Sequence, residues 1–408
     1  MPKISIIIPV FNRWDLTKDC LLSLKEHTSG DFEILVVDNA SSDSTEQACP
    51  YLGRKLFGKY FFYIRNDQNR NFAGACNQGA KEARGDFLFF LNNDTLATQN
   101  YLPPLIETMT ENKQLCGVGP LLLYPEFLGM KDVVQHLGVV VEPEFYVRHL
   151  YEGFPKDHPV CQKKRLFRII TAAALLLPKQ RFLEAGLFDE GFVNGGEDVE
   201  LCLRMTKGQA GFMIDPSSVL YHLGSQSPGR HDHEISNGER FREKSTSMLV
   251  PDFHIYVGAD GYSLKLNDHL APYVGLPQKR KAFFAKYCAK LKTPEALHEL
   301  LKKEPLCLEA YLALVDYYIK LNDIAQALTI FARATFFLPT KSLLEQYLAL
   351  AKQANETITI ERITERLIKF DHESKNVVKQ RAESLRMFWE TVDNKALVQL
   401  YDQWLSDV

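Results

Sequence analysis

Residues 4–10 read ISIIIPV, and three similar apolar runs follow within the first hundred residues, at 33–37, 60–64 and 86–91. Each run is short, rich in branched or aromatic residues and bounded by polar or turn residues, which is typical of strands buried on both faces. Amphipathic stretches with helical spacing lie between the runs, at 15–26, 44–52 and 74–83. This alternation predicts an α/β fold with a parallel sheet, whose ligands bind at the carboxyl ends of the strands.

The composition changes further along the chain. From about residue 277, Gly becomes scarce, and Leu, Ala, Glu and Lys recur at helical spacing to the C-terminus. Seven residues fall at the offsets of the tetratricopeptide pattern: Tyr311, Leu314, Tyr318, Ala327, Phe331, Ala334 and Pro339. We therefore expect an α/β domain over 1–250, a connector over 251–280 and an all-α domain over 281–408. That last domain is either a tetratricopeptide-like repeat or an irregular helical bundle.

Charge and cysteine content exclude several classes of protein. The 408 residues carry a net charge of −3, which provides no global basic field for nucleic acid. Eight cysteines are scattered without a CxxC pair, so neither a zinc framework nor a disulfide scaffold is indicated. The longest apolar runs are shorter than the ~18–20 residues of a membrane span, and no signal-peptide pattern opens the chain. We expect a cytoplasmic protein without a transmembrane segment, in peripheral contact with the membrane at most.

Asp38 directly follows the second apolar run. An unpaired carboxylate at the end of a buried strand is costly unless it meets water or a ligand. It could accept the N3–H group of uracil or thymine, whereas cytosine has an acceptor at that position. The alternative is structural, because Asp38 could instead cap the following turn with Ser41 and Ser42.

Three more polar clusters follow apolar segments or open a helix. Asn92, Asn93 and Asp94 follow the run 86–91, where a carboxylate could hold a divalent cation against a diphosphate, or simply end the strand. The sequence GGED at 195–198 opens an amphipathic helix. Its glycines allow close approach of a substrate, although acidic residues are also favoured at any helix N-terminus. His222 ends a short strand, and a lone histidine is more often packed or solvated than a ligand.

Taken together, the motifs resemble a known family. They are ISIIIPVFNR (4–13), LVVDNASSD (35–43), RNDQNRNFAGACNQGAKEARGDFLFFLNNDT (65–95), GLFDEGFVNGGEDVELCLR (186–204) and YHLGSQS (221–227). Their order and spacing are similar to those of the inverting family 2 glycosyltransferases, and most similar to a rhamnosyltransferase-like branch. The resemblance covers about residues 1–250. It implies a GT-A fold, which is a Rossmann-like, mostly parallel sheet with flanking helices.

The same resemblance implies roles for individual residues. Asp198 would be the general base and Glu197 would position the acceptor. Asp94 and His222 would hold a divalent cation, Mg²⁺ or Mn²⁺, although Asn92 replaces the first aspartate of the family's DxD motif. The implied nucleotide-binding residues are Pro9, Phe11, Asn12, Asp38, Asn77 and Asn93.

The resemblance also implies an activity. The enzyme would move a hexosyl or deoxyhexosyl group from a UDP- or dTDP-sugar to an acceptor hydroxyl, in assembly of a bacterial surface polysaccharide such as O-antigen or capsule. An alternative is a protein acceptor, such as flagellin or an adhesin, recognised by the helical tail. The tail could instead bind a partner or form a homodimer, and a non-catalytic scaffold is the weakest alternative. A nicotinamide dehydrogenase is excluded because PVFNRWD (9–15) lacks the GxGxxG fingerprint.

Overall fold

The computed structural model describes residues 3–207, 211–224 and 233–407, and the chain divides into two compact units. The first unit consists of Met1–Phe127, Lys131–Val140 and Val147–Val250, and the second of Leu128–Met130, Val141–Tyr146 and Pro251–Val408.

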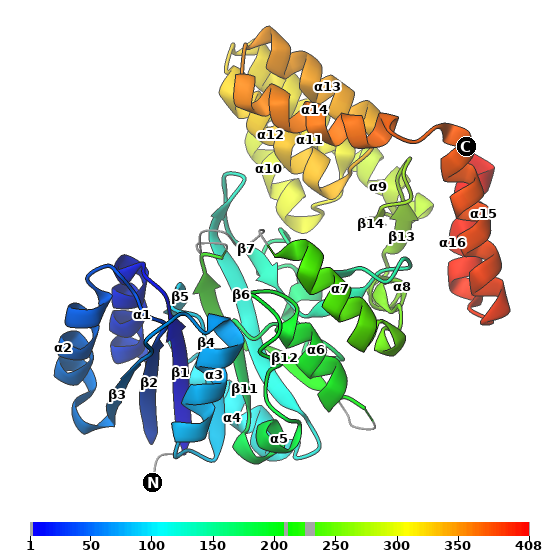
Figure 1. Cartoon of the computed structure of the whole chain (residues 1–408). Helices are drawn as coiled ribbons and strands as arrows, with labels where there is room; N and C mark the ends of the chain where they lie inside the picture. Colours follow the sequence, from blue (N-terminus) through cyan, green and yellow to red (C-terminus); the bar gives the residue numbers. More distant parts are fainter. Residues whose placement is uncertain (1–2, 208–210, 225–232, 408) are drawn as a thin grey trace. The chain divides into compact units, whose positions relative to one another are not determined.

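The strands up to Val250 are shown in Figure 1 and have these bounds: β1 (Ile4–Val10), β2 (Phe32–Asp38), β3 (Phe61–Arg65), β4 (Phe87–Leu91), β5 (Thr95–Ala97), β6 (Gly117–Phe127), β7 (Met130–His136), β8 (Val139–Val141), β9 (Val147–His149), β10 (Arg165–Phe167), β11 (Ala174–Pro178) and β12 (Phe212–His222). The helices of this part are α1 (Trp14–His27), α2 (Thr45–Phe57), α3 (Asn71–Glu82), α4 (Leu102–Glu111), α5 (Lys179–Glu184), α6 (Glu197–Met205) and α7 (Glu234–Ser245).

A mixed sheet forms the centre of the first unit. Its strand order is β10-β12-β6-β11-β4-β1-β2-β3, with β5 paired to β12 and β7 paired to β6. β1 runs parallel to both β2 and β4, whereas β11 runs antiparallel to β4. The expected α/β class with flanking helices is confirmed. The antiparallel β11 has a consequence for function, because the residues that precede it lie at the same sheet edge as the residues that follow β4.

Helices cover both faces of β1, which explains its uninterrupted apolar sequence. Ile6 and Ile8 belong to a buried cluster that also contains Leu21 of α1. Ile7 points to the opposite face, against α3, and a Cβ added to Gly79 of that helix would lie 2.6 Å from Cγ2 of Ile7. Because the side chains of a strand alternate between faces, every position of β1 must be apolar or small to be buried.

The second unit is a run of helices with one small hairpin. Its elements are α8 (Phe253–Ala259), β13 (Ser263–Leu266), β14 (Pro272–Gly275), α9 (Gln278–Cys288), α10 (Pro294–Lys303), α11 (Leu308–Lys320), α12 (Ile324–Phe337), α13 (Lys341–Gln353), α14 (Thr357–Asp371), α15 (Lys375–Thr391) and α16 (Lys395–Asp407). Residues 251–280, expected to form a connector, are therefore folded, as α8, the β13–β14 hairpin and the start of α9. Of the pattern positions, Tyr311 and Leu314 of α11 and Ala327 and Phe331 of α12 are buried. No helix in the described part of the chain is long and apolar enough to cross a membrane.

Candidate active site

A cavity of about 540 Å³ collects polar residues from distant segments of the first unit. Its lining includes Asn92 after β4, residues 171–173 before β11, residues 194–199 at the start of α6, and His222 at the end of β12. The sheet topology explains this gathering, because each of these points lies at one edge of the sheet. The sequence clusters around Asn92, Asp198 and His222 are thus brought together.

Asp94 and His222 form a buried polar pair at this edge. Nε2 of His222 lies 3.2 Å from Oδ1 of Asp94 and 3.3 Å from Nδ2 of Asn92. Burial opposes ionisation of Asp94, but the hydrogen bond and charge of His222, helped by backbone N–H groups, outweigh it and lower the pKa of this carboxyl group. Asp94 is therefore a carboxylate, as a cation ligand must be.

Gln135 orients the imidazole of His222 from the other side. Nδ1 of His222 lies 2.5 Å from Oε1 of Gln135, and Nε2 of Gln135 donates to the backbone carbonyl of His222 at 2.9 Å. Since that carbonyl can only accept, the Gln135 amide is fixed with Oε1 toward Nδ1, and Nδ1 must carry a proton. Nε2 is therefore the nitrogen that faces Asp94 and Asn92. It donates to Asp94 while it carries a proton, and a cation that replaces this proton would be bound by its lone pair. No pattern in the sequence singles out Gln135, which lies 87 residues from His222.

These side chains fit a divalent cation. Oδ1 of Asn92 is buried and has no hydrogen-bond partner among the described residues, and it lies on the residue that contacts His222. A carboxylate oxygen, an amide oxygen and an imidazole nitrogen are all suitable donors for Mn²⁺, and oxygen donors suit Mg²⁺. Within residues 3–207, 211–224 and 233–407, no cluster of three or more His, Cys, Asp or Glu side chains is placed to hold a metal. Asp94, Asn92 and His222 would therefore need oxygen ligands from water or a phosphate to complete the coordination of a cation.

Asp198 faces the same cavity from the first turn of α6. Gly196, the residue before the helix, has a φ of 95°, a left-handed conformation that favours glycine. Oδ2 of Asp198 accepts a hydrogen bond from the N–H of Ala172 at 3.2 Å, and Oδ1 accepts one from the N–H of Val199 at 2.8 Å. Asp198 is half-buried, while Glu197 is only 6% exposed. The carboxylate of Asp198 is therefore held in one orientation at the cavity wall.

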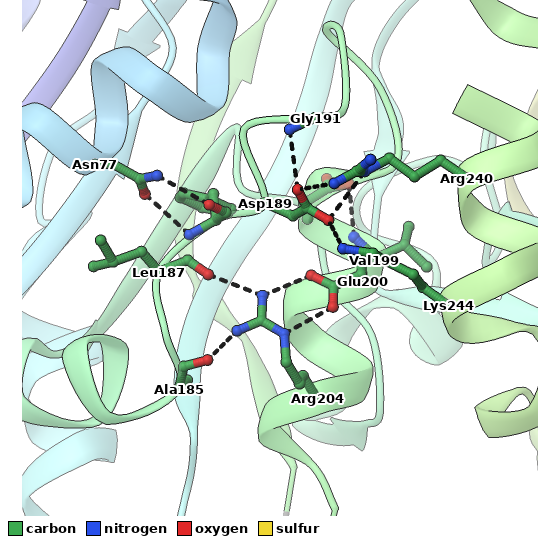
Figure 2. Close-up of polar contacts among 12 residues, drawn as sticks. Asn77, Ala185, Leu187, Asp189, Gly191, Val199, Glu200, Arg204, Arg240 and Lys244 are labelled. Atoms are coloured by element: carbon green, nitrogen blue, oxygen red, sulfur yellow. Dashed lines mark hydrogen bonds and ion pairs between the residues drawn. The ribbon is translucent and has the colours of Figure 1, made fainter. Parts of the chain in front are cut away.

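The segment that leads into α6 is anchored by two helices (Figure 2). Asp189 accepts hydrogen bonds from Arg240 at 2.6 and 3.0 Å and from Lys244 at 2.5 Å, both on α7. Burial opposes ionisation of Asp189, but these charged donors outweigh it and hold its pKa well below the ordinary range. On α6, Arg204 donates two hydrogen bonds to the carboxylate of Glu200, at 2.6 and 2.7 Å, as expected from their i,i+4 spacing.

Asn77, which the resemblance places among the nucleotide-binding residues, takes part in this anchoring. Its Oδ1 accepts from the N–H of Phe188 at 2.9 Å, and its Nδ2 donates to the carbonyl of Phe188 at 2.9 Å and to Glu190 at 3.0 Å (Figure 2). Both amide hydrogens are used, and the residue is 2% exposed. The side chain therefore ties α3 to the segment before α6. Asn93 also has a protein partner, since its Nδ2 donates to Thr17 of α1 at 2.9 Å.

Asp38 lies at the end of β2 and is fully buried. Oδ1 accepts from the N–H and hydroxyl of Ser41 at 2.9 and 2.5 Å, and Oδ2 accepts from the hydroxyl of Tyr63 at 2.5 Å. Arg65 lies 3.7 Å away. The turn cap expected as the structural alternative for Asp38 is thus present, with Ser41 although not with Ser42, and three of the roughly four acceptor positions of the carboxylate are occupied.

The other expected nucleotide-binding residues surround the end of β1. Pro9 belongs to β1, Phe11 is 42% exposed, and Asn12 has a φ of 58°. Oδ1 of Asn12 accepts from the N–H of Ser42 at 2.8 Å, which joins the loops after β1 and β2. These residues lie at the end of β1, which is next to β4 in the sheet, and in the loop that follows it. Among the described residues, those that line the 540 Å³ cavity do not include Pro9, Phe11 or Asn12. Arg13 of the same loop interacts electrostatically with Asp94, which connects the two regions.

Comparison with known proteins agrees with this geometry. Residues 5–168 match the profile of the family described as "Glycosyl transferase family 2". The first unit is therefore similar to a glycosyltransferase family 2 domain over these residues. Its expected GT-A fold, with a mixed sheet and flanking helices, is the one described above. The match agrees with the resemblance in the motifs, and it extends from β1 to β10 and includes the Asn92–Asp94 turn.

Curated relatives and solved structures are similar over part of their length. The chain is 32% identical over 234 residues to the O-antigen biosynthesis protein RfbC of Myxococcus xanthus, covering 55% of this chain and 18% of that protein. It is 27% identical over 271 residues to validoxylamine A glucosyltransferase of Streptomyces hygroscopicus subsp. jinggangensis, covering 61% and 62%. The chain thus spans less than two thirds of these relatives. A solved structure of GalNAc-T7 with UDP, GalNAc and Mn²⁺ is similar with a TM-score of 0.46 at 17% identity, covering 54% of this chain and 44% of that one.

Proposed function

We propose that the chain is an inverting, metal-assisted glycosyltransferase that moves a hexosyl or deoxyhexosyl group from a UDP- or dTDP-sugar to an acceptor hydroxyl. The observation that carries the proposal is that one cavity of about 540 Å³ is lined by Asn92, Asp198 and His222. A single displacement needs a base for the acceptor and positive charge beside the leaving diphosphate. The cavity has candidates for both, and the family 2 profile match supports the same chemistry.

In this proposal Asp198 takes the proton from the acceptor hydroxyl. The N–H of Ala172 holds one carboxylate oxygen at 3.2 Å, so the base keeps its orientation while the acceptor oxygen attacks the anomeric carbon. Attack opposite the leaving diphosphate inverts the configuration in one step. A double displacement would need a nucleophilic carboxylate on the other face of the sugar. Glu197, buried beside Asp198, positions the acceptor.

Asp94 and His222, together with Oδ1 of Asn92, would hold the divalent cation. Bound there, Mg²⁺ or Mn²⁺ supplies positive charge that stabilises the departing β-phosphate. Gln135 fixes one proton on Nδ1 of His222, so Nε2 is the nitrogen that can bind a cation, and the low pKa of Asp94 keeps its carboxylate ionised. With Asn92 in place of an aspartate, we expect the cation to bind together with the sugar nucleotide and weakly without it.

The nucleotide base is proposed to lie at the ends of β1 and β2, beside Pro9, Phe11, Asn12 and Asp38. The exposed ring of Phe11 offers a surface for stacking, and the end of a parallel strand is the usual position of a ligand in such sheets. Asp38 has about one acceptor position left for the N3–H of uracil or thymine. Asn93, on the turn between this region and Asp94, is proposed to contact the nucleotide beside the diphosphate.

For the acceptor we propose a glycan, lipid-linked or free, in surface-polysaccharide assembly. The name of the Myxococcus relative, an O-antigen biosynthesis protein, supports this choice. The rhamnosyltransferase-like branch remains part of the proposal, as does action in the cytoplasm. A protein acceptor is a second candidate, supported by the antiparallel α11–α12 pair, whose buried residues fit a tetratricopeptide-like repeat that offers a groove for peptides.

The test is a panel of UDP- and dTDP-sugars with Mg²⁺ or Mn²⁺, followed by release of UDP or dTDP. We expect one donor class to be turned over and metal chelation to abolish the release. Asp198→Asn should lower kcat by at least 10³-fold, on the order expected for loss of a general base, while leaving the Kd of UDP within about twofold. The anomeric configuration of the product, read from its proton coupling constant, tests inversion.

Asp316→Asn is the matched control, because Asp316 is an exposed aspartate on α11 and loses the same charge. It should keep the kcat of the unmodified chain. Substantial transfer by Asp198→Asn would remove this residue as the base. If neither UDP nor dTDP binds in calorimetry with either metal, the chain is a scaffold and the proposal is wrong.

A further inference from the structure

Residues 278–293, which form α9 and the turn after it, have an unusual charge. The segment reads QKRKAFFAKYCAKLKT, with six basic residues and no acidic one. The whole chain has a net charge of −3, so a segment of +6 is a strong local departure. Three aromatic residues lie within the same two turns of helix. This combination is unlike an ordinary solvated helix face, where charges of both signs alternate.

The inward side of α9 explains only part of this composition. Arg280 forms an ion pair with the buried Glu304 at 2.8 Å and lies over the ring of Tyr262 at 4.4 Å. Cys288 is buried. These residues hold α9 within the second unit, next to the β13–β14 hairpin and α10 (Figure 1). For the remaining lysines, Phe283 and Tyr287, the described part of the chain shows no ion pair that would hold α9 in this way.

The outward side is a stripe that we call the α9 outer face: Lys279, Phe283, Lys286, Tyr287 and Lys290. All five residues are exposed, including 61% of Phe283 and 44% of Tyr287. The two rings stack on each other with centroids 6.3 Å apart, so they form one apolar ridge flanked by lysines. Large aromatic side chains that stay exposed next to each other indicate an interaction surface.

We propose that the α9 outer face docks the protein on the surface of an anionic phospholipid bilayer. With the exposed Lys281 and Lys292, residues 278–293 present five exposed lysines. Clusters of four to eight basic residues bind anionic lipid headgroups, and each cation near the surface is worth roughly fivefold in affinity. Phe and Tyr side chains insert at the boundary of headgroups and acyl chains, where a ring is partly apolar and partly wet. The exposed aromatic ridge favours a membrane over duplex nucleic acid, which offers no apolar layer to receive it.

The proposal is independent of the sugar-transfer reaction, because lipid binding needs no donor. It is tested by flotation of the full chain with vesicles of phosphatidylcholine containing about 30% phosphatidylglycerol, and with vesicles of phosphatidylcholine alone. We expect binding only to the anionic vesicles, and weaker binding at about 0.5 M salt than at about 0.1 M, because salt screens surface charge. The triple variant Lys279→Gln, Lys286→Gln, Lys290→Gln should bind about 100-fold more weakly, from three cations at roughly fivefold each.

Phe283→Ser tests the aromatic part, and we expect it to weaken binding several-fold with little change in the salt dependence. Matched controls lie on other exposed helices: Lys352→Gln with Lys379→Gln and Lys395→Gln removes the same charge, and Ile358→Ser removes an apolar side chain that is 80% exposed. Both controls should bind like the unmodified chain. Equal losses in the triple variant and its control, no flotation with anionic vesicles, or preferential binding to an RNA oligonucleotide at equal salt would each overturn the proposal. Thermal unfolding of each variant confirms that it is folded.

Discussion

Gln135→Met provides the sharpest test of how the site is built. The substitution keeps the length of the side chain but removes both of its hydrogen bonds to His222, at 2.5 and 2.9 Å. The Nδ1–H group and the backbone carbonyl of His222 then lose their partners at a position where Gln135 is only 4% exposed. Each unpaired buried group costs about 1–3 kcal/mol, so the free energy of unfolding should fall by about 2–6 kcal/mol.

The functional consequence concerns the proton of the imidazole. Without Oε1 of Gln135, the proton is better placed on Nε2, where it can donate to Asp94 at 3.2 Å. A protonated Nε2 cannot bind a metal. Removing a group that orients a metal-bound histidine typically lowers metal affinity by about 10–100-fold, and we expect a change of that size here.

Two measurements check this prediction. Electron paramagnetic resonance of free Mn²⁺, in the presence of UDP, gives the metal affinity without any turnover. Nitrogen-15 NMR of labelled histidines in metal-free protein reports which ring nitrogen carries the proton. Gln47→Met is the matched control, because Gln47 is exposed on α2. If Gln135→Met keeps the Nδ1–H form of His222, or binds Mn²⁺ within about twofold of the unmodified chain, the positioning role is refuted.

Three further predictions concern the surroundings of the site. Asp189 has a lowered folded pKa, so its stabilisation is present above the unfolded value of about 4 and is lost as pH falls through the lower folded value. Urea unfolding should show Asp189→Asn less stable by about 1–3 kcal/mol at neutral pH but nearly equal in strong acid; an equal loss at both would contradict this. Gly196→Ala should lose about 1–3 kcal/mol of stability from its φ of 95° and lower kcat, unlike Gly238→Ala on α7, where the added Cβ meets nothing within 4 Å. Tyr63→Phe frees an acceptor position on Asp38, so calorimetry should give up to about fivefold tighter UDP binding if Asp38 reads the base; weaker binding would exclude that role.

Much of the fold could be predicted because its signals are local. The continuous apolar run at 4–10 follows from burial on both faces, and the structure places β1 over those same residues, Ile4–Val10. The helix that begins at Glu197 is likewise where the sequence places it, although its C-terminal boundary is Met205. The antiparallel direction of β11 was not predictable, because strand direction depends on pairing with β4 and not on the local pattern.

The candidate site likewise contains residues that the sequence could locate and residues that it could not. Asp94, Asp198 and His222 could be located from the sequence because each lies near the end of a strand or at the start of a helix, whereas their roles stay predictions. The orientation of Asn77 could not be predicted, because its partners lie 111 and 113 residues away and compete with any nucleotide. Tyr63 and Gln135 carry no motif. They matter only because the sheet brings them within hydrogen-bond distance of Asp38 and His222.

The sequence by itself therefore determined the α/β alternation, the motifs that resemble family 2 glycosyltransferases, and the residue types proposed for proton transfer and cation binding. Periodicity and strand ends are encoded within a few residues, so they can be read without knowing the fold. Only the tertiary structure decided which atoms face one another across the cavity. It placed Gln135 beside Nδ1 of His222 and left the side-chain Oδ1 of Asn92 without a partner among the described residues. It also occupied most acceptor positions of the Asp38 carboxylate with Ser41 and Tyr63. The physical reason is that a hydrogen bond or a cation ligand needs atoms within about 3 Å, and for residues distant in sequence that proximity exists only after the sheet has formed.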